Sequence, residues 1–318
     1  MKKWLSMVAL ILVGVACAAR AQTGTIRIVI AFPPGGPVDF VARVLAEGLA
    51  KDLNASIIVD NRPGANGGIA AQFVAKSAPD GNTLWLTSAG AAVMNPSLYE
   101  NLTYDMQRDF APVSLVVNNV EVLVVNPTNP ARNAADLVAY SKQRIDALAI
   151  ASSGVGSMPH LAMELMADAS KANLLHVPYK GAAPAITDVM GNQVVGFFGD
   201  IPGLIGFIRG GKLKPLGIAA PKRHPLLPDV PTLDEQGIHG VESNNWYALF
   251  APAKTPPARI ALLNQAVRHA LTTEPYRSRL VESGAEPLPG SPDELAALVK
   301  SDTARWGKII HDKKIKGE

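Results

Sequence analysis

FPPGGPVDF at residues 32–40 joins a β-rich apolar run at 26–31 to a run with helical periodicity. Pro33 and Pro34 stiffen the turn, the two glycines let a ligand approach the backbone, and the helix that follows begins with unpaired N–H groups. A strand-turn-helix junction of this kind suits an anion. Alternatively, the glycines only turn the chain and the aspartate only stabilises the first helical turn. The candidate ligand contacts are Phe32, Pro34, Gly35, Gly36 and Asp39.

A second loop of the same kind, SSGVGSMPH at 152–160, follows an apolar run at 148–151 and precedes another helical run. Its hydroxyl groups and glycine N–H groups fit a carboxylate or phosphate. Both loops stand at carboxyl ends of expected strands, where α/β sheets bind ligands, and this favours a cleft between two lobes. The candidates in this loop are Ser153, Gly154, Val155, Gly156 and Ser157.

Further candidates lie at four comparable junctions: NRPGANGG at 61–68, SAG at 88–90, VPYKGAAPA at 177–185 and GDIPG at 199–203. Among them, Tyr179 suits closure over a ligand edge, Lys180 offers a cation, and Asp200 suits acceptance from an amine or hydroxyl. Turn and cap roles explain each residue equally well when it is taken alone. The candidates at these junctions are Asn66, Ser88, Ala89, Tyr179, Lys180, Gly181 and Asp200.

Strand-like and helical runs alternate along most of the chain, which predicts an α/β protein with parallel sheets and helices on both faces. NPTNP at 126–130 and the stretch at 237–245 each separate such runs, so the chain is expected to leave one lobe and return to it. We therefore expect a discontinuous first lobe at 22–125 plus 245–318 and a second lobe at 126–244. Three proline-opened helices are expected in the tail, at 256–271, 275–283 and 292–309.

The first 21 residues have the pattern of a cleavable signal peptide: Lys2 and Lys3, an apolar run at 4–18, then Ala-Arg-Ala. The mature chain is expected to start near Gln22, in the periplasm. Without the three basic residues of the signal, 27 of the 30 basic residues remain against 27 acidic ones. The calculated pI of 8.9 then gives no support for nucleic-acid or anionic-membrane binding. Cys17, the one cysteine, is expected to leave with the signal.

Patterns for catalysis, metal binding and cofactors are weak. The sequence has no G-x-S-x-G elbow and no H-E-x-x-H motif. His160 and Glu164 stand four apart, as two ligands of a zinc site would, but no second pair has a recognisable spacing and the other histidines are scattered. GFIRGGKL at 206–213 follows a helix and lacks the P-loop hydroxyl, and GVGSMP at 154–159 lacks the third glycine of a dinucleotide fingerprint. We therefore expect no metal and no cofactor.

Four segments together resemble the Bug receptors, the substrate-binding family of tripartite tricarboxylate transporters. The segments are FPPGGPVDFVAR, VDNRPGANGGIAAQFVAKSAPDG, SSGVGSMPHLAMELM and VPYKGAAPAITDVMGNQV, and the resemblance extends from about residue 26 to 309. It implies a two-lobed periplasmic binding protein of the Venus-flytrap type, type II-like, with each lobe a sheet flanked by helices. It also implies a small carboxylate ligand, often a dicarboxylate, and a membrane permease as the partner.

The resemblance further implies which parts of the chain bind the ligand. The turn at 34–36 would reach one end of it, partly through water, while loops at 88–89, 153–157 and 179–181 would hold the rest, mainly with backbone amides and hydroxyls. This chain departs from the family pattern at one point. Many members carry Phe-Asp at a strand end where this chain has Phe198-Gly199, with Asp200 following.

Two other functions remain compatible with the sequence. One is a secreted hydrolase that uses His160 with Ser157 or Asp200. The other is a sensor partner that presents its ligand to a signalling receptor, which would share the fold. Product formation separates the first from a receptor, and proximity to permease genes separates the second.

Overall fold

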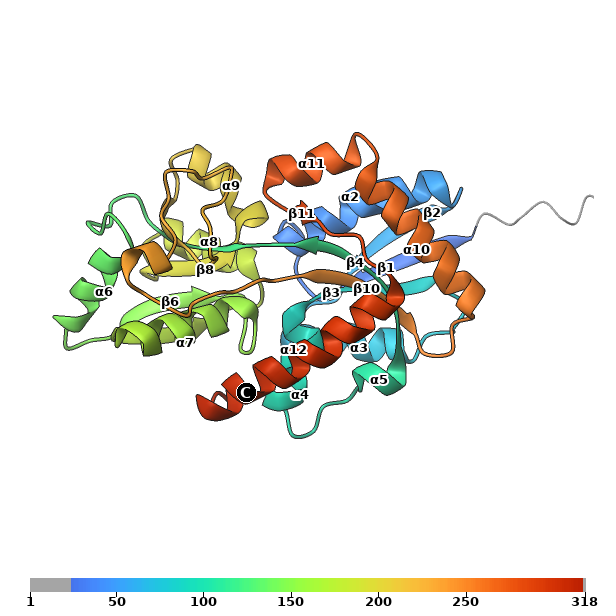
Figure 1. Ribbon diagram of the computed structural model, residues 1–318, viewed down its shortest axis with the longest axis horizontal. Coiled ribbons are helices and arrows are strands. Elements are labelled where there is room, and N and C mark those ends of the chain that lie inside the picture. The colour runs from blue at the N-terminus through green and yellow to red at the C-terminus, as the bar shows by residue number, and fades with distance from the viewer. Residues whose placement is uncertain (1–23, 317–318) are drawn as a thin grey trace, which may run out of the picture.

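The computed structural model describes residues 24–316 and divides them between two β-sheets, each covered by helices on both faces (Figure 1). The signal peptide, Cys17 and the expected start near Gln22 lie outside the described residues. No helix within residues 24–316 has the length and apolar character needed to cross a membrane. The expected α/β class with a sheet flanked by helices in each lobe is confirmed.

The first lobe is built on a six-stranded sheet with the order β11-β4-β10-β3-β1-β2. Its strands are β1 (Thr25–Ile30), β2 (Ser56–Asn61), β3 (Thr83–Ser88), β4 (Phe110–Asn118), β10 (Tyr247–Pro252) and β11 (Glu286–Pro287). Its helices are α2 (Pro37–Asp52), η1 (Ala65–Gly67), α3 (Gly68–Ala75), η2 (Gly90–Met94), α4 (Asn95–Leu98), α5 (Met106–Asp109), α10 (Pro257–Thr272), α11 (Tyr276–Ser283) and α12 (Pro292–Asp312).

The second lobe is built on a five-stranded sheet with the order β7-β6-β8-β5-β9. Its strands are β5 (Glu121–Val125), β6 (Leu148–Ser152), β7 (Leu174–Pro178), β8 (Gly196–Asp200) and β9 (Lys214–Ile218). Its helices are α6 (Ala134–Lys142), α7 (Met158–Ser170), α8 (Ala182–Met190), α9 (Ile201–Arg209) and η3 (Asp234–Gln236).

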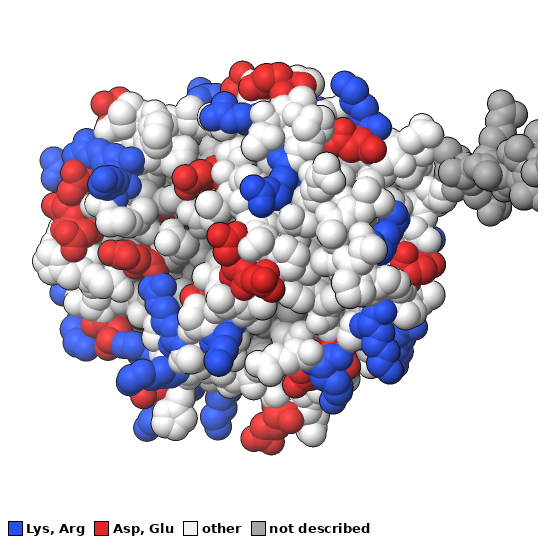
Figure 2. Space-filling model, turned by 45° about the vertical axis from the view of Figure 1, so that its right-hand side comes forward, with Lys and Arg blue, Asp and Glu red and all other residues white. Residues whose placement is uncertain are grey.

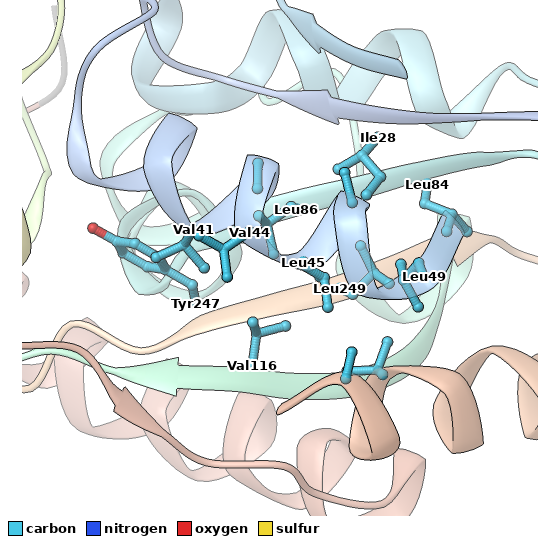
Figure 3. Close-up of a cluster of buried hydrophobic side chains, with 14 of the residues drawn as sticks. Ile28, Val41, Val44, Leu45, Leu49, Leu84, Leu86, Val116, Tyr247 and Leu249 are labelled. Carbon is cyan, nitrogen blue, oxygen red and sulfur yellow. The ribbon is translucent and has the colours of Figure 1, made fainter. Parts of the chain in front are cut away.

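Four apolar clusters hold the helices on the sheets. In the first lobe one cluster packs α2, α10 and α11 against one face, and Figure 3 shows part of it, with Leu45 and Leu49 of α2 next to Leu249 of β10. A second cluster packs α3, η2 and α12 against the other face. In the second lobe α6 and α7 cover one face, and α8 and α9 cover the other. Each lobe thus has apolar clusters of its own, and Met158 and Leu161 of α7 extend from the second lobe into the second cluster of the first.

The expectation of parallel sheets is correct only in part, because both sheets are mixed. Strands β1, β2 and β3 pair in parallel, as do β6, β7 and β8, but β10 is antiparallel to β3 and β4, and β5 is antiparallel to β8 and β9. The two-residue β11 is also antiparallel, to β4. The reversed strands β5 and β10 are those that follow each crossing between the lobes. They enter their sheet from the opposite end because they arrive directly from the other lobe, without a connecting helix.

Two adjacent segments connect the lobes, at 118–120 and 243–245, and in Figure 1 they run side by side in green and orange. The Asn245 N–H donates to the Asn119 carbonyl at 2.9 Å, and the Asn119 N–H donates to the Asn245 carbonyl at 3.3 Å. The outgoing crossing lies earlier than the expected boundary at 126, because β5 pairs within the second sheet and not the first. An apolar five-residue strand does not encode which sheet it will join.

Acidic and basic side chains are interspersed on the surface that Figure 2 presents, without a broad region of one sign. This mixture agrees with the equal numbers of basic and acidic residues that follow Ala21. The face in this view therefore provides no extended basic footprint for a nucleic acid.

Candidate ligand-binding site

A small pocket lies between the two lobes, and strand ends and helix starts of both lobes line it. Its volume is about 20 Å³, which is the room that one water molecule needs. No lysine or arginine is among the described residues that line it. The lining residues are Phe32, Pro33, Gly36, Pro37, Val38, Ser88, Ser153, Ser157, Met158, Pro159, Ala182, Ala183, Phe197, Gly199, Asp200, Asn245 and Tyr247.

Four helices begin at this pocket: α2 from the first lobe, and α7, α8 and α9 from the second. Their N-cap residues are Gly36, Ser157, Gly181 and Asp200. In α2, α8 and α9 no side chain of the N-cap residue accepts from the first turn, which leaves backbone N–H groups available at the starts of α2 and α8. At the start of α9 the Ile201 N–H already donates to the Val120 carbonyl at 3.1 Å. Unpaired N–H groups and the positive end of a helix dipole both favour an anion.

Six of the candidate residues named from the sequence line the pocket: Phe32, Gly36, Ser88, Ser153, Ser157 and Asp200. The other eleven do not line it: Pro34, Gly35, Asp39, Asn66, Ala89, Gly154, Val155, Gly156, Tyr179, Lys180 and Gly181. The first turn and the serine loop therefore meet at one place, from opposite lobes, as the sequence predicted. Several of the remaining candidates support these loops from behind.

Asp39 is a buried support of the first turn. Its carboxylate accepts from the Gly35 N–H at 3.1 Å, from Asn61 Nδ2 at 3.0 Å and from two nitrogens of Arg43 at 2.9 Å each. Burial opposes ionisation of Asp39, but the hydrogen bonds from Arg43, Asn61 and Gly35 outweigh it and hold the pKa below 3.8. These contacts agree with the alternative that the sequence left open, in which Asp39 has a stabilising role.

We expect Asp39→Ala to lower the free energy of unfolding at pH 7 by about 1–3 kcal/mol, because buried donors lose their acceptor. A carboxyl whose folded pKa is depressed stabilises the fold above its unfolded pKa and loses that effect as pH falls through the folded pKa. The difference between variant and wild type should therefore shrink below about pH 3.8. Urea titrations of variant and wild type at pH 7 and below about pH 3.8 measure this difference in unfolding free energy.

The matched control is Asp229→Ala, since Asp229 is an exposed acid on the opposite lobe. It should change the unfolding free energy by less than about 0.5 kcal/mol at either pH. An equal loss for both variants at pH 7 would contradict the supporting role of Asp39.

The serine loop is held by hydrogen bonds within itself. The Ser157 hydroxyl donates to the Gly154 carbonyl at 2.7 Å and accepts from the His160 backbone N–H at 3.4 Å. The Gly156 N–H donates to His160 Nδ1 at 3.0 Å. Gly156 has a φ of +74°, and a Cβ there would lie 2.0 Å from Leu98 Cδ1 of the other lobe, so only glycine fits.

Two histidines stack beneath this loop, a contact that sequence reasoning missed. The rings of His160 and His176 lie 3.7 Å apart and 6° from parallel, and His176 Nε2 lies 2.6 Å from the Ser152 hydroxyl. Burial, together with the neighbouring His160, lowers the pKa of His176 to about 4. His176 comes from the next strand, β7, and no sequence spacing connects it to His160. Within residues 24–316, no three histidine, cysteine or acidic side chains gather as a metal site would need.

The loop at 177–181 contributes through packing. The Tyr179 hydroxyl donates to Asp188 Oδ2 at 2.6 Å, and Lys180 is exposed. Gly181 has a φ of +110°, and a Cβ there would lie 2.8 Å from Pro33 Cδ of the opposite lobe. A ligand contact from Tyr179 would have to compete with Asp188 for its hydroxyl.

Asn66 and Ala89 lie just outside the pocket. Asn66 Nδ2 donates to Asn95 Oδ1 at 2.8 Å, and Asn95 Nδ2 donates back to the Asn66 carbonyl at 3.1 Å. Ala89 is fully buried and its N–H donates to the Trp246 carbonyl at 3.0 Å. Both residues thus fix the loop that follows β3, which carries Ser88 into the pocket.

Asp200 closes the second-lobe side of the pocket and is 6% exposed. Asn245 Nδ2 donates to both of its oxygens, at 3.1 and 3.0 Å, and the Tyr247 hydroxyl donates to Oδ2. Burial raises the pKa of Asp200 to about 7, although the bonds from Tyr247 and Asn245 act in the opposite direction. Neither Asn245 nor Tyr247 was predicted. The signal available was their position, since they follow the return crossing directly.

Comparison with known proteins gives the family and the fold. A sequence model of the tripartite tricarboxylate transporter family receptor matches residues 41–315. The structure of the periplasmic binding protein BugD has a TM-score of 0.89 at 33% identity, over 93% of this chain and 99% of that one. R. palustris Rpa4515 with adipate has a TM-score of 0.90 at 33% identity, over 94% and 100%. MatC from Rhodopseudomonas palustris with bound malate has a TM-score of 0.86 at 34% identity, over 91% and 99%.

Proposed function

Because the chain belongs to the receptor family of the tripartite tricarboxylate transporters, we propose that it binds a small carboxylate between its lobes and delivers it to a membrane permease. The observation that carries the proposal is the meeting of four helix starts and two serine-bearing loops at one pocket. Backbone N–H groups and hydroxyls there suit an acid group without a cationic side chain.

We propose a dicarboxylate as the ligand class. Two relatives of known structure hold adipate and malate, and both share about a third of their residues with this chain. The start of α2 faces the pocket from one lobe, while the starts of α8 and α9 face it from the other. One carboxylate at each side would use both sets of donors. We further propose contacts from the six lining candidates, with Asn245 and Tyr247 added.

Binding would require the lobes to separate and close again. A pocket of about 20 Å³ holds one water molecule, and a dicarboxylate is several times larger. The crossing segments form a two-stranded hinge whose backbone hydrogen bonds can persist while the lobes rotate. A ligand that contacts both lobes stabilises only the closed arrangement, and the permease would recognise that arrangement.

The expected contacts supply enough free energy for micromolar binding of a carboxylate. A Kd of about 1 μM corresponds to about 8 kcal/mol. Hydrogen bonds to a charged group contribute about 1.5–3 kcal/mol each, and a helix start adds about 0.3–1 kcal/mol. About six such contacts suffice after ordering costs are subtracted.

We propose that the protein acts in the periplasm after export by its signal peptide, with the mature chain starting near Gln22. BugD, described as a periplasmic binding protein, supports this location. Supply of ligand to a sensor instead of a permease would use the same pocket. Proximity of the gene to permease genes distinguishes the two.

We propose that the bound acid is released unchanged. In the hydrolase alternative, Ser157 would have to give its proton to the His160 ring. The Ser157 hydroxyl instead donates to the Gly154 carbonyl, while His160 Nδ1 accepts from the Gly156 N–H. These bonds support a structural role for both side chains.

The test is binding of adipate, measured by calorimetry and by the thermal shift of the purified mature protein. We expect a micromolar Kd and a melting temperature that rises by several degrees at saturating ligand, as linkage requires. NMR spectra of the mixture after days of incubation should contain adipate alone.

Hexane-1,6-diol is the matched control, because it has the chain length of adipate without the acid groups. Equal stabilisation by the diol, or stabilisation by sugars alone, would overturn the carboxylate assignment. A new product in the NMR spectra would decide for an enzyme.

A further inference from the structure

Two carboxylic side chains face each other beneath the pocket. Glu121 opens β5 and Asp200 ends β8, and the two are direct partners in the antiparallel register. Directly opposed residues carry their Cβ atoms about 4.5–5.5 Å apart, on the same face of the sheet. Glu121 is fully buried and Asp200 is 6% exposed, so water screens neither charge well.

The partners of this pair are neutral. Glu121 Oε2 accepts from the Ser243 hydroxyl at 3.0 Å, and Oε1 has no hydrogen-bond partner within residues 24–316. Asp200 accepts from Asn245 and from the Tyr247 hydroxyl. In Figure 3 this hydroxyl points out of the apolar cluster that holds the Tyr247 ring. None of the described lysines, arginines or histidines forms an ion pair with either carboxyl group.

Each lobe and one crossing contribute to the cluster. β5 and β8 provide Glu121 and Asp200, the return crossing provides Ser243 and Asn245, and β10 provides Tyr247. Tyr247 is a third titratable group, next to the two carboxyls, and it affects the pKa of Asp200. Burial raises the pKa of Tyr247 well above the usual value. Burial also raises the pKa of Glu121, and the Asp200 charge raises it further. Two adjacent buried carboxyls cannot both ionise freely.

We infer that the Glu121–Asp200 pair takes up a proton when the pocket binds its acid, so that affinity for a dicarboxylate falls as pH rises. The inference rests on the proposed function. An anionic ligand adds negative charge beside Asp200 in a pocket whose described lining has no lysine or arginine. The repulsion is relieved when a solvent proton forms an O–H bond on one carboxyl oxygen of the pair. No bond in the ligand breaks.

The sign of the pH dependence follows from this. Burial places the pKa of Asp200 at about 7 before the ligand enters, and an anionic ligand raises it further. Below that pKa the proton is already present and binding needs none. Above it, each complex must take a proton from solution, so the affinity falls by up to tenfold for each pH unit. Both carboxyls of adipate stay ionised throughout the range above about pH 6.5.

Calorimetric titration of the mature protein with adipate tests the inference. Titrations at about pH 6.5 and about pH 8.5, each in two buffers with different ionisation enthalpies, give both the Kd and the number of protons taken up. We expect binding about tenfold or more weaker at the higher pH, with close to one proton taken up per adipate there. Asp200→Asn and Glu121→Gln should each reduce the proton uptake by more than half. Asp229→Asn, at an exposed acid outside the pair, should retain it.

Other outcomes would overturn the inference alone or the proposed function with it. An unchanged Kd without proton uptake in the wild type would overturn the inference and leave the proposed function intact, whatever the variants do. Full proton uptake in both folded variants would also overturn it, because the proton would then bind elsewhere. If no carboxylate binds at either pH, the proposed function fails and the inference fails with it. Circular dichroism establishes that each variant is folded before titration.

Discussion

Gly181→Ala is expected to weaken adipate binding at least tenfold. Gly181 precedes α8 in the second lobe with a φ of +110°, and a Cβ added there would lie 2.8 Å from Pro33 Cδ in the first lobe. Because a proline ring is rigid, the methyl group would hold the lobes apart at the point where the two binding loops meet. A loss of about 1.4 kcal/mol in closure free energy is a factor of ten in Kd. Isothermal titration calorimetry with adipate measures the Kd of variant and wild type.

Gly211→Ala is the matched control. Gly211 also has a positive φ, +66°, but a Cβ there meets nothing within 4 Å. Both variants should lose about 1–2 kcal/mol of folding stability from left-handed backbone strain, and only Gly181→Ala should lose affinity. If both variants bind adipate like the wild type, closure does not depend on this contact.

The largest stability effect is expected at Trp85. This residue of β3 is fully buried, with its ring 4.9 Å from that of Phe110, 5.8 Å from Tyr104 and 6.0 Å from Phe250. Truncation to alanine removes these contacts and leaves a cavity at the centre of the first lobe. We expect Trp85→Ala to lower the free energy of unfolding by about 3–5 kcal/mol, measured by urea denaturation with far-UV circular dichroism.

Trp85→Phe separates ring packing from the indole N–H. Trp85 Nε1 has no hydrogen-bond partner within residues 24–316, so phenylalanine removes an unsatisfied buried donor while it keeps an aromatic ring. We expect this variant to lose less than half as much stability as Trp85→Ala. Equal losses would mean that the indole nitrogen, and not the aromatic packing, carries the effect.

Much of the fold could be predicted because its elements depend on local patterns. The β-rich apolar run at 26–31 is β1 (Thr25–Ile30), and the expected helix at 256–271 is α10 (Pro257–Thr272). β4 (Phe110–Asn118) was missed because Pro112 interrupts an apolar run that otherwise resembles a strand. Its pairing with β10 is irregular near that proline. The ladder therefore does not require the backbone N–H that a proline lacks. Which sheet β5 joins is a long-range choice that no local pattern contains.

The site was predictable where it is built from loops that join a strand to the following helix. The turn at 32–40 and the serine loop at 152–160 can both be recognised by the glycine, proline and hydroxyl residues at such junctions. Asp200 stands at such a junction too, but Glu121, Asn245 and Tyr247 carry no such signal. They come together because two segments more than a hundred residues apart cross side by side. A pattern read along one stretch of chain cannot contain that proximity.

The place of β10 has a consequence for the order in which the protein can be assembled. This strand, residues 247–252, lies between β3 and β4, so the first 118 residues alone cannot close their own sheet. While the chain is being synthesised, β3 and β4 lack the neighbour that joins them until the whole second lobe has emerged. Unpaired strand edges of this kind invite association with other chains. We therefore expect shortened chains that end before residue 247 to aggregate, even though they contain the complete second sheet.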